Sequence, residues 1–151
     1  MKAVFDAPIR TTGALLDRVL AGGHPSVVSF ETPACGPCQT LRPVLDALAR
    51  EFRERIRVVR VPDSAEGWLA ARWHLAFVPT LVFLSGGHEV ARIKGDPGWQ
   101  ALHEYVLYLL DRARRPEPAE GPRHTLRARF GPARLDDADA IRPAALLFAG
   151  R

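Results

Sequence analysis

The sequence has only two cysteines among its 151 residues, one methionine, and no long uninterrupted run of apolar residues. Two cysteines are too few for the disulfide framework of a small secreted domain. A transmembrane helix needs about 20 mainly apolar residues, so no membrane span is expected. The first residues, Met1 to Asp6, lack the charged stretch and apolar core of a signal peptide. These absences predict a cytoplasmic protein with no membrane partner.

The sequence also lacks a strong excess of charge. Its net charge is +4, with 12 Lys and Arg against 12 Asp and Glu in residues 1–111, and 9 against 5 in residues 112–151. Four surplus charges near one end, without interleaved aromatic residues, are a weak footprint for nucleic acid, which is not an expected partner. The composition, 47% hydrophobic and 25% charged, is that of an ordinary folded domain.

Hydrophobic periodicity predicts one compact α/β domain in residues 1–112. Apolar residues recur every three to four positions where helices are expected, and short β-branched or alternating runs mark the strands. Crossover helices predict parallel strands, whereas Gly86-Gly87 predicts an antiparallel hairpin. The expected fold is therefore a mixed four- to five-stranded sheet flanked by helices. Helices are predicted over residues 14–20, 36–52, 64–74 and 98–112, and strands over 25–30, 56–61, 78–84 and 88–93.

The character of the sequence changes after residue 112. Residues 113–123 are rich in Pro and Arg and are typical of a linker. Residues 124–151 combine an alternating apolar and basic stretch, an acidic stretch, and an apolar run from Ala144 to Ala149. We expect this short C-terminal extension to dock on the domain or on a second copy of the chain. A dimer through residues 124–151 is therefore a further hypothesis.

The two cysteines form the motif Cys35-Gly36-Pro37-Cys38 at a predicted strand-to-helix junction. The thiolate attacks disulfides, and the unpaired amides at a helix N-terminus favour negative charge on Cys35. Pro37 suits the first turn, where a missing amide hydrogen costs nothing, and Cys38 is the expected resolving thiol. A zinc site would need two more ligands, and the five histidines offer no closely spaced pair, so no metal is expected. An inert structural pair is the other alternative.

Two motifs about 40 residues apart resemble the thioredoxin family over residues 5–112. Cys35-Gly36-Pro37-Cys38 matches the family's hallmark loop, and Val78-Pro79-Thr80 matches its cis-proline segment. Further matches are Pro43, Arg60, Gly86-Gly87 and Gly95. The resemblance implies the thioredoxin fold and a cis Val78-Pro79 peptide that faces Cys35. It also implies that Val78, Pro79, Thr80 and Gly95 bind the substrate, with the Val78 backbone open to a substrate strand.

The resemblance further implies dithiol–disulfide exchange, in the reducing direction, with disulfide-containing proteins as substrates and a role in cell redox homeostasis. An external reductant similar to thioredoxin reductase would regenerate the cysteine pair, and no cofactor would be needed. The alternative is a thioredoxin-like binding or assembly module whose cysteines are vestigial. Such a module would recruit its partner through the Val78-Pro79 groove or the C-terminal extension.

Three positions near the cysteines depart from the family pattern. Ser29 stands where a buried aspartate is common, and Glu31 and Ala34 stand where tryptophans are common. Since side chains alternate along a strand, Ser29 and Glu31 would share one face of the sheet. We therefore hypothesise that Glu31 takes over the acid/base role and accepts a proton from Cys38, directly or through water. The alternative is that Glu31 is an exposed carboxylate at the end of a strand.

Overall fold

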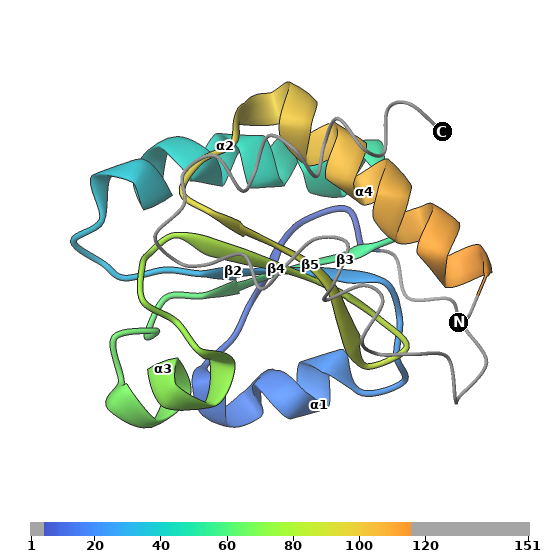
Figure 1. Ribbon diagram of the computed structural model, residues 1–151. Helices are drawn as coiled ribbons and strands as arrows, with labels where there is room; N and C mark the ends of the chain where they lie inside the picture. Colours follow the sequence, from blue (N-terminus) through green and yellow to red (C-terminus); the bar gives the residue numbers. More distant parts are fainter. Residues whose placement is uncertain (1–4, 116–151) are drawn as a thin grey trace.

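The fold is built on a five-stranded mixed sheet, seen in a computed structural model that describes residues 5–115 (Figure 1). The strands are β1 (Ile9–Arg10), β2 (Ser26–Phe30), β3 (Arg57–Val61), β4 (Thr80–Ser85) and β5 (His88–Lys94). The helices are the 3₁₀ helix η1 (Gly13–Leu15), α1 (Leu16–Leu20), α2 (Gly36–Glu51), α3 (Gly67–Trp73) and α4 (Gly98–Arg114). The strand order is β1-β3-β2-β4-β5. β1 and β2 run parallel to β3, whereas β4 is antiparallel to both β2 and β5.

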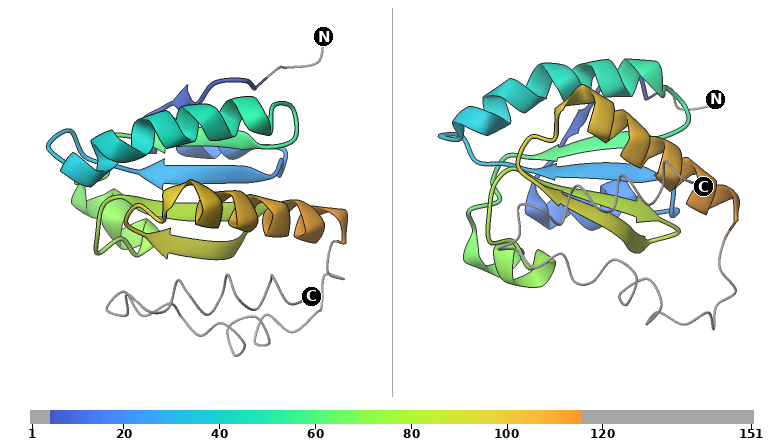
Figure 2. Two further views of the ribbon diagram at one scale, coloured as in Figure 1. Left: turned by 90° about the horizontal axis from the view of Figure 1, so that it is seen from above. Right: turned by 45° about the horizontal axis from the view of Figure 1, so that its top comes forward.

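Helices cover both faces of the sheet. α2 and α4 lie on one face, and α1 and α3 lie on the other (Figures 1 and 2). β2 is the central strand, and all five of its residues are buried, so its side chains alternate between two apolar clusters. Val27 belongs to the cluster of Leu41 from α2 and Leu102 from α4. Phe30 belongs to the cluster on the other face, with Leu69 from α3.

The strand register brings three segments of the chain together at one end of the sheet, which we call the cysteine end. Phe30, the last residue of β2, pairs with Thr80, the first residue of β4. Thr80 in turn pairs with Lys94, the last residue of β5. The chain therefore leaves β2 toward the cysteine loop, enters β4 from the proline segment, and leaves β5 toward Gly95, all at this end.

The predicted fold class is confirmed, and each predicted helix and strand is present with boundaries within three residues. β1 is absent from the prediction because two residues are too few for a periodic pattern to register. The first predicted helix begins as η1 before it becomes α1. α2 continues through Pro43, although a proline removes one backbone hydrogen bond from a helix interior.

The C-terminal predictions fall largely outside the described residues. α4 continues to Arg114, so the first two residues of the predicted linker are helical, and Arg115 caps the helix. Residues 116–123 of the linker, with the whole predicted extension of residues 124–151, lie beyond the described range. The domain division and the dimer therefore stay predictions. Between residues 5 and 115, no helix is long and apolar enough to cross a membrane.

Candidate active site

Cys35 and Cys38 form a disulfide bond at the start of α2, with an S–S distance of 2.16 Å. Cys35 is the N-cap residue of α2, and the amide of Cys38 donates a hydrogen bond to its Sγ at 3.1 Å. Gly36 and Pro37 form the exposed first turn between them. Cys35 is 8% exposed, whereas Cys38 is fully buried. Cys35 is therefore the sulfur that an outside thiol or disulfide can reach.

The proline segment approaches the sheet beside the cysteine loop. The Val78-Pro79 peptide is cis, as the resemblance implies. The Pro79 carbonyl accepts a hydrogen bond from the Gly95 amide at 2.7 Å, and the Thr80 hydroxyl donates to the Phe77 carbonyl at 2.7 Å. These two bonds fix the segment from both sides at the cysteine end of the sheet.

Val78 itself has no backbone hydrogen bond to any residue that the structure describes. It lies before the first residue of β4 and is half-buried. An amide and a carbonyl without a partner among residues 5–115 can pair with an extended chain from outside, as in recognition by strand addition.

Glu31 is fully buried and bound to two arginines. Its Oε2 accepts a hydrogen bond from Arg60 Nε at 2.8 Å, and its Oε1 accepts from Arg60 Nη2 at 3.2 Å. Arg42 Nε stands 3.7 Å from Oε1, an ion-pair contact that is too long for a hydrogen bond. The alternative of an exposed Glu31 carboxylate is therefore wrong. Burial is tolerated because both carboxylate oxygens have cationic partners.

The backbone around Glu31 is fixed as well. Its amide donates to the Val61 carbonyl at 2.9 Å and to Ser64 Oγ at 3.1 Å, and its carbonyl accepts from the Ser64 amide. Ser29 lies on the same sheet face as Val27, beneath α2, and is fully buried. Its Oγ has no hydrogen-bond partner among the described residues. Glu31, rather than Ser29, thus carries the buried charge on this face.

Three residues near the cysteines are missing from the sequence prediction. Arg42 follows Cys38 by one helical turn, a spacing that places both on one side of α2, so sequence reasoning could have found it. Phe77 immediately precedes the Val78-Pro79 motif, and Lys94 immediately precedes Gly95. The Lys94 ammonium lies over the Phe77 ring, 4.7 Å from its centroid, a contact between distant positions that no local pattern signals.

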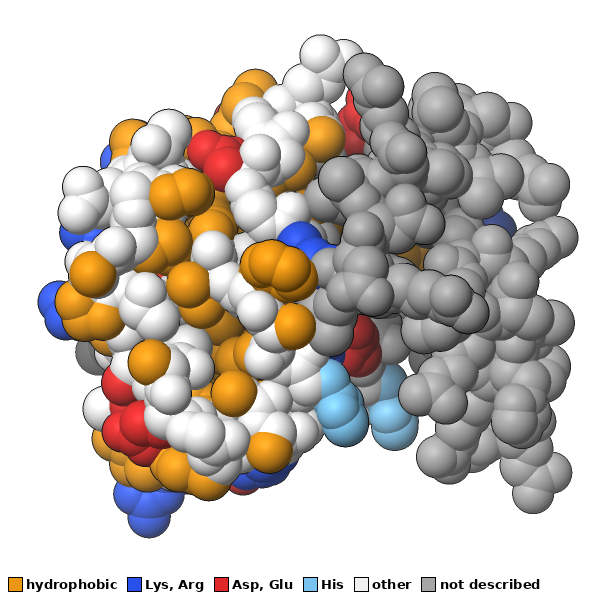
Figure 3. Space-filling view, turned by 60° about the vertical axis from the view of Figure 1, so that its left-hand side comes forward, with side chains coloured by type: hydrophobic (Ala, Val, Ile, Leu, Met, Phe, Trp, Pro, Cys, Tyr) orange, Lys and Arg blue, Asp and Glu red, His pale blue; other side chains and the backbone are white. Residues whose placement is uncertain are grey.

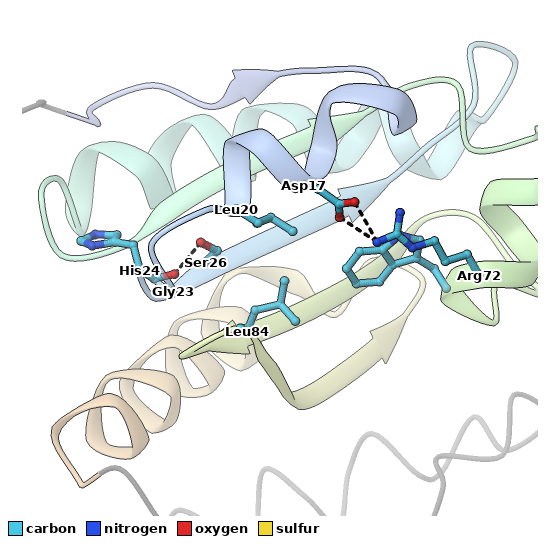
Figure 4. Close-up of a pocket in the computed structure, with 9 residues that line it drawn as sticks. Asp17, Leu20, Gly23, His24, Ser26, Arg72 and Leu84 are labelled. Atoms are coloured by element: carbon cyan, nitrogen blue, oxygen red, sulfur yellow. Dashed lines mark hydrogen bonds and ion pairs between the residues drawn. The ribbon is translucent and has the colours of Figure 1, made fainter. Parts of the chain in front are cut away.

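A hollow of about 260 Å³ lies elsewhere on the molecule, between α1, α3 and the sheet (Figure 4). Leu20, Trp73 and Leu84 line it, and Asp17 and Arg72 form an ion pair at one end of it. It adjoins the first residue of β2 and the hairpin turn after β4, the opposite end of the sheet from the cysteines. It is therefore separate from the redox site. Within residues 5–115, no three His, Cys, Asp or Glu side chains are grouped to hold a metal ion.

Comparisons with known proteins agree with this geometry. Residues 9–107 match the family Thioredoxin. The chain is 32% identical over 85 residues to Thioredoxin 1 of Nostoc sp. (strain PCC 7120 / SAG 25.82 / UTEX 2576), which covers 56% of this chain and 79% of that protein. It is 32% identical over 92 residues to the bifunctional thioredoxin reductase/thioredoxin of Mycobacterium leprae (strain TN), covering 61% of this chain and 20% of the relative.

A solved structure is similar as well. A point mutant of the thioredoxin from Halobacterium salinarum NRC-1 superimposes with a TM-score of 0.66 and 28% sequence identity, covering 73% of this chain and 96% of that one. The fold and the cysteine pair at the start of α2 define a thiol–disulfide oxidoreductase. The chain belongs to the thioredoxin family.

Proposed function

We propose that this protein reduces disulfides in other proteins, with Cys35 as the nucleophile and Cys38 as the resolving thiol. The observation that carries the proposal is the asymmetry of the pair: Cys35 keeps 8% of its surface exposed at the N-terminus of α2, whereas Cys38 is fully buried behind it. A nucleophile must reach its substrate, whereas a resolving thiol needs to reach only the first cysteine.

The exchange proceeds in two balanced steps from the reduced dithiol. In the first step, the Cys35 thiolate attacks one sulfur of the substrate disulfide and forms a mixed disulfide with it. The other substrate sulfur leaves as a thiolate, which takes up a proton. Cys38 then loses its proton and attacks Cys35 Sγ, so the Cys35–Cys38 bond forms and the second substrate thiol departs. The substrate gains two electrons, and the protein is left with the disulfide present in the structure.

The substrate would dock as an extended strand beside the proline segment. The proposed binding edge consists of Val78, Pro79, Thr80 and Gly95. The Val78 amide and carbonyl, which have no partner within residues 5–115, would supply its hydrogen bonds. Main-chain pairing of this kind accepts many sequences, because it uses groups that every residue carries. It therefore suits an enzyme that meets disulfides in several proteins.

We also infer that Glu31 accepts the proton of Cys38, directly or through water. Its carboxylate is buried against Arg42, one turn along α2 from Cys38. A carboxylate offers about four lone-pair sites, and Arg60 occupies only two of them. Glu31→Gln should slow the resolving step and alter its pH profile, whereas an unchanged profile would contradict this role. Glu104→Gln on α4 is the matched control.

The test of the main proposal is a disulfide-reduction assay with the wild type, Cys35→Ser and Cys38→Ser. Both variants should fall to background turnover. Cys38→Ser should accumulate a mixed disulfide with its substrate, because Cys35 can attack but nothing can resolve the adduct. Cys35→Ser should accumulate none. Equal trapping by the two variants would reject the assignment of the nucleophile.

An external dithiol enzyme similar to thioredoxin reductase would return two electrons to the Cys35–Cys38 disulfide. The name of the Mycobacterium leprae relative, which joins a thioredoxin reductase to a thioredoxin, supports this class of reductant. Such a pair would serve redox homeostasis in the cytoplasm. Recruitment of a partner without exchange is the alternative. It predicts that Cys35 is alkylated no faster than a cysteine in a free peptide at neutral pH.

A further inference from the structure

The cysteine end of the sheet carries a cation held on an exposed aromatic ring. Phe77 is 53% exposed, although large aromatic side chains are usually more buried. The Lys94 ammonium lies 4.7 Å from the Phe77 ring centroid, within the range of a cation–π contact. We call these two side chains the Phe77–Lys94 pair. The contact orders a side chain that would otherwise sample many rotamers.

The pair lies beside the open backbone of Val78. Phe77 directly precedes Val78, and the Phe77 carbonyl is held by the Thr80 hydroxyl. Lys94 pairs in register with Thr80 on the neighbouring strand. Strands in a sheet are about 4.8 Å apart, so a segment that pairs with Val78 passes within side-chain reach of both residues.

The acidic side chains in the segments that follow the strands at this end already have hydrogen-bond partners. Asp63 accepts hydrogen bonds from the Gly13 amide, Asp96 accepts from the Gly98 amide, and Glu31 is bound to Arg60. Lys94, in contrast, forms no ion pair with any described residue. Figure 3 looks toward this end of the molecule and shows apolar side chains spread over the middle of the face. A cation ordered beside an exposed aromatic ring offers a selective contact for a carboxylate.

We propose that the Phe77–Lys94 pair selects protein disulfides that have an acidic residue close to the reacting cysteine. This specificity rests on the proposed function, because the substrate segment must first pair with Val78. The acidic side chain would meet the Lys94 ammonium while its neighbours in the extended segment contact the Phe77 ring. The pair would thus add a preference for the substrate's side chains to a binding edge that otherwise recognises only the substrate's main chain.

The test compares the reduction of peptide disulfides that differ in the charge of one residue. Short peptides with one central cysteine are prepared as disulfide-linked homodimers, carrying Glu, Gln or Lys in turn at each flanking position. Their kcat/KM values are measured for the wild type, Lys94→Gln and Lys94→Glu. Arg10→Gln is the matched control, because it removes one positive charge from β1, the strand at the opposite edge of the sheet.

The wild type should prefer Glu over Lys at one flanking position by about threefold to fivefold, the range of a partly exposed ion pair. Lys94→Gln should abolish the preference, Lys94→Glu should reverse it, and Arg10→Gln should retain it. The preference should also shrink as salt is raised, because the contact is partly screened. The ratio of two peptides within each variant is independent of any change in overall activity.

Two results would overturn the proposal. One is equal kcat/KM for the Glu and Lys peptides at every position in the wild type, and the other is a preference that survives in Lys94→Gln. Failure of the wild type to reduce any peptide would instead reject the proposed function, and the specificity with it. Reduction without charge preference rejects the specificity alone.

Discussion

The buried carboxylate of Glu31 sets this chain apart at the scale of single residues. An ion removed from water is costly unless its partners compensate, and here Arg60 binds both oxygens while Arg42 lies nearby. Arg60 pairs in register with Ser29, so the charge pair spans β3 and the chain just beyond the end of β2. Ser29, at the position where family members commonly have an aspartate, is thus uncharged, and the buried charge lies two residues further along the chain, at Glu31.

Removal of Arg60 should expose the cost of this buried charge. Arg60→Met leaves the Glu31 carboxylate buried with only the longer Arg42 contact, so we expect the free energy of unfolding to fall by about 3 kcal/mol. Guanidinium denaturation at neutral pH measures the change. Adding Glu31→Leu should recover most of the loss, since the double variant buries no unpaired charge. A double variant no more stable than Arg60→Met would argue against the charge as the cause.

His24 should make stability depend on pH. Burial, and secondarily the charge of Arg57, lowers the pKa of His24 from its ordinary value of 6.5. The folded state therefore disfavours the protonated imidazole, and the unfolded state binds more protons as the pH falls. The contribution of His24 to stability is complete above pH 6.5 and is lost as the pH falls through the lowered pKa of the folded state.

The measurement is the free energy of unfolding of the wild type and His24→Gln at a series of pH values from neutral to mildly acidic. The wild type should lose stability relative to the variant as the pH falls. His88→Gln, at an exposed position on β5, is the control. Parallel curves for the wild type and His24→Gln would show that the histidine does not titrate differently in the folded state.

At the scale of elements, the C-terminus of α3 shows how side chains complete a helix end. His74 follows α3 with φ of 53° and ψ of 48°, the left-handed region that favours glycine. Arg92 Nη1 from β5 donates to the carbonyls of Trp73 at 2.7 Å and His74 at 3.1 Å. The helix end is thus fixed by a neighbouring strand, although its capping residue is not the preferred one.

His74→Gly should therefore stabilise the protein. Glycine adopts the left-handed conformation without a clash of its side chain, so we expect the free energy of unfolding to rise by about 1 kcal/mol. His74→Ala, which keeps a Cβ atom and lacks the polar ring, should give no such gain. Thermal and denaturant unfolding of both variants measures the difference. Equal effects of Gly and Ala would show that the ring, not the backbone, determines stability here.

A helix, strand or turn is predictable from the sequence where the pattern that indicates it lies within that segment of the chain. Apolar spacing located α2 and α4, and Gly86-Gly87 located the hairpin, because period and turn chemistry lie within a few residues. The cis Val78-Pro79 peptide was predictable from the family resemblance. The Glu31–Arg60 and Phe77–Lys94 contacts were not, because each joins residues on different strands or loops. Such pairs depend on register, which local patterns leave open.

At the scale of the whole molecule, the described residues contain everything that the proposed chemistry requires. Among residues 5–115, the members of the two apolar clusters run from Leu16 to Leu110, and the cysteines, the proline segment and Lys94 lie within the same range. The surplus positive charge of the sequence, in contrast, falls after residue 111. This division supports the proposal that residues 1–112 form a domain that functions independently of residues 124–151.

A chain shortened to end at Arg115 tests this division. It retains all of α4, so we expect cooperative unfolding with a midpoint close to that of the full chain, and peptide-disulfide reduction within about twofold of it. Gel filtration of both chains at several concentrations adds a readout for the proposed dimer. If the full chain is dimeric and the shortened chain monomeric, residues after Arg115 supply the interface. If the shortened chain unfolds without cooperativity, those residues complete the domain, because a core that is closed by residue 115 would not need them.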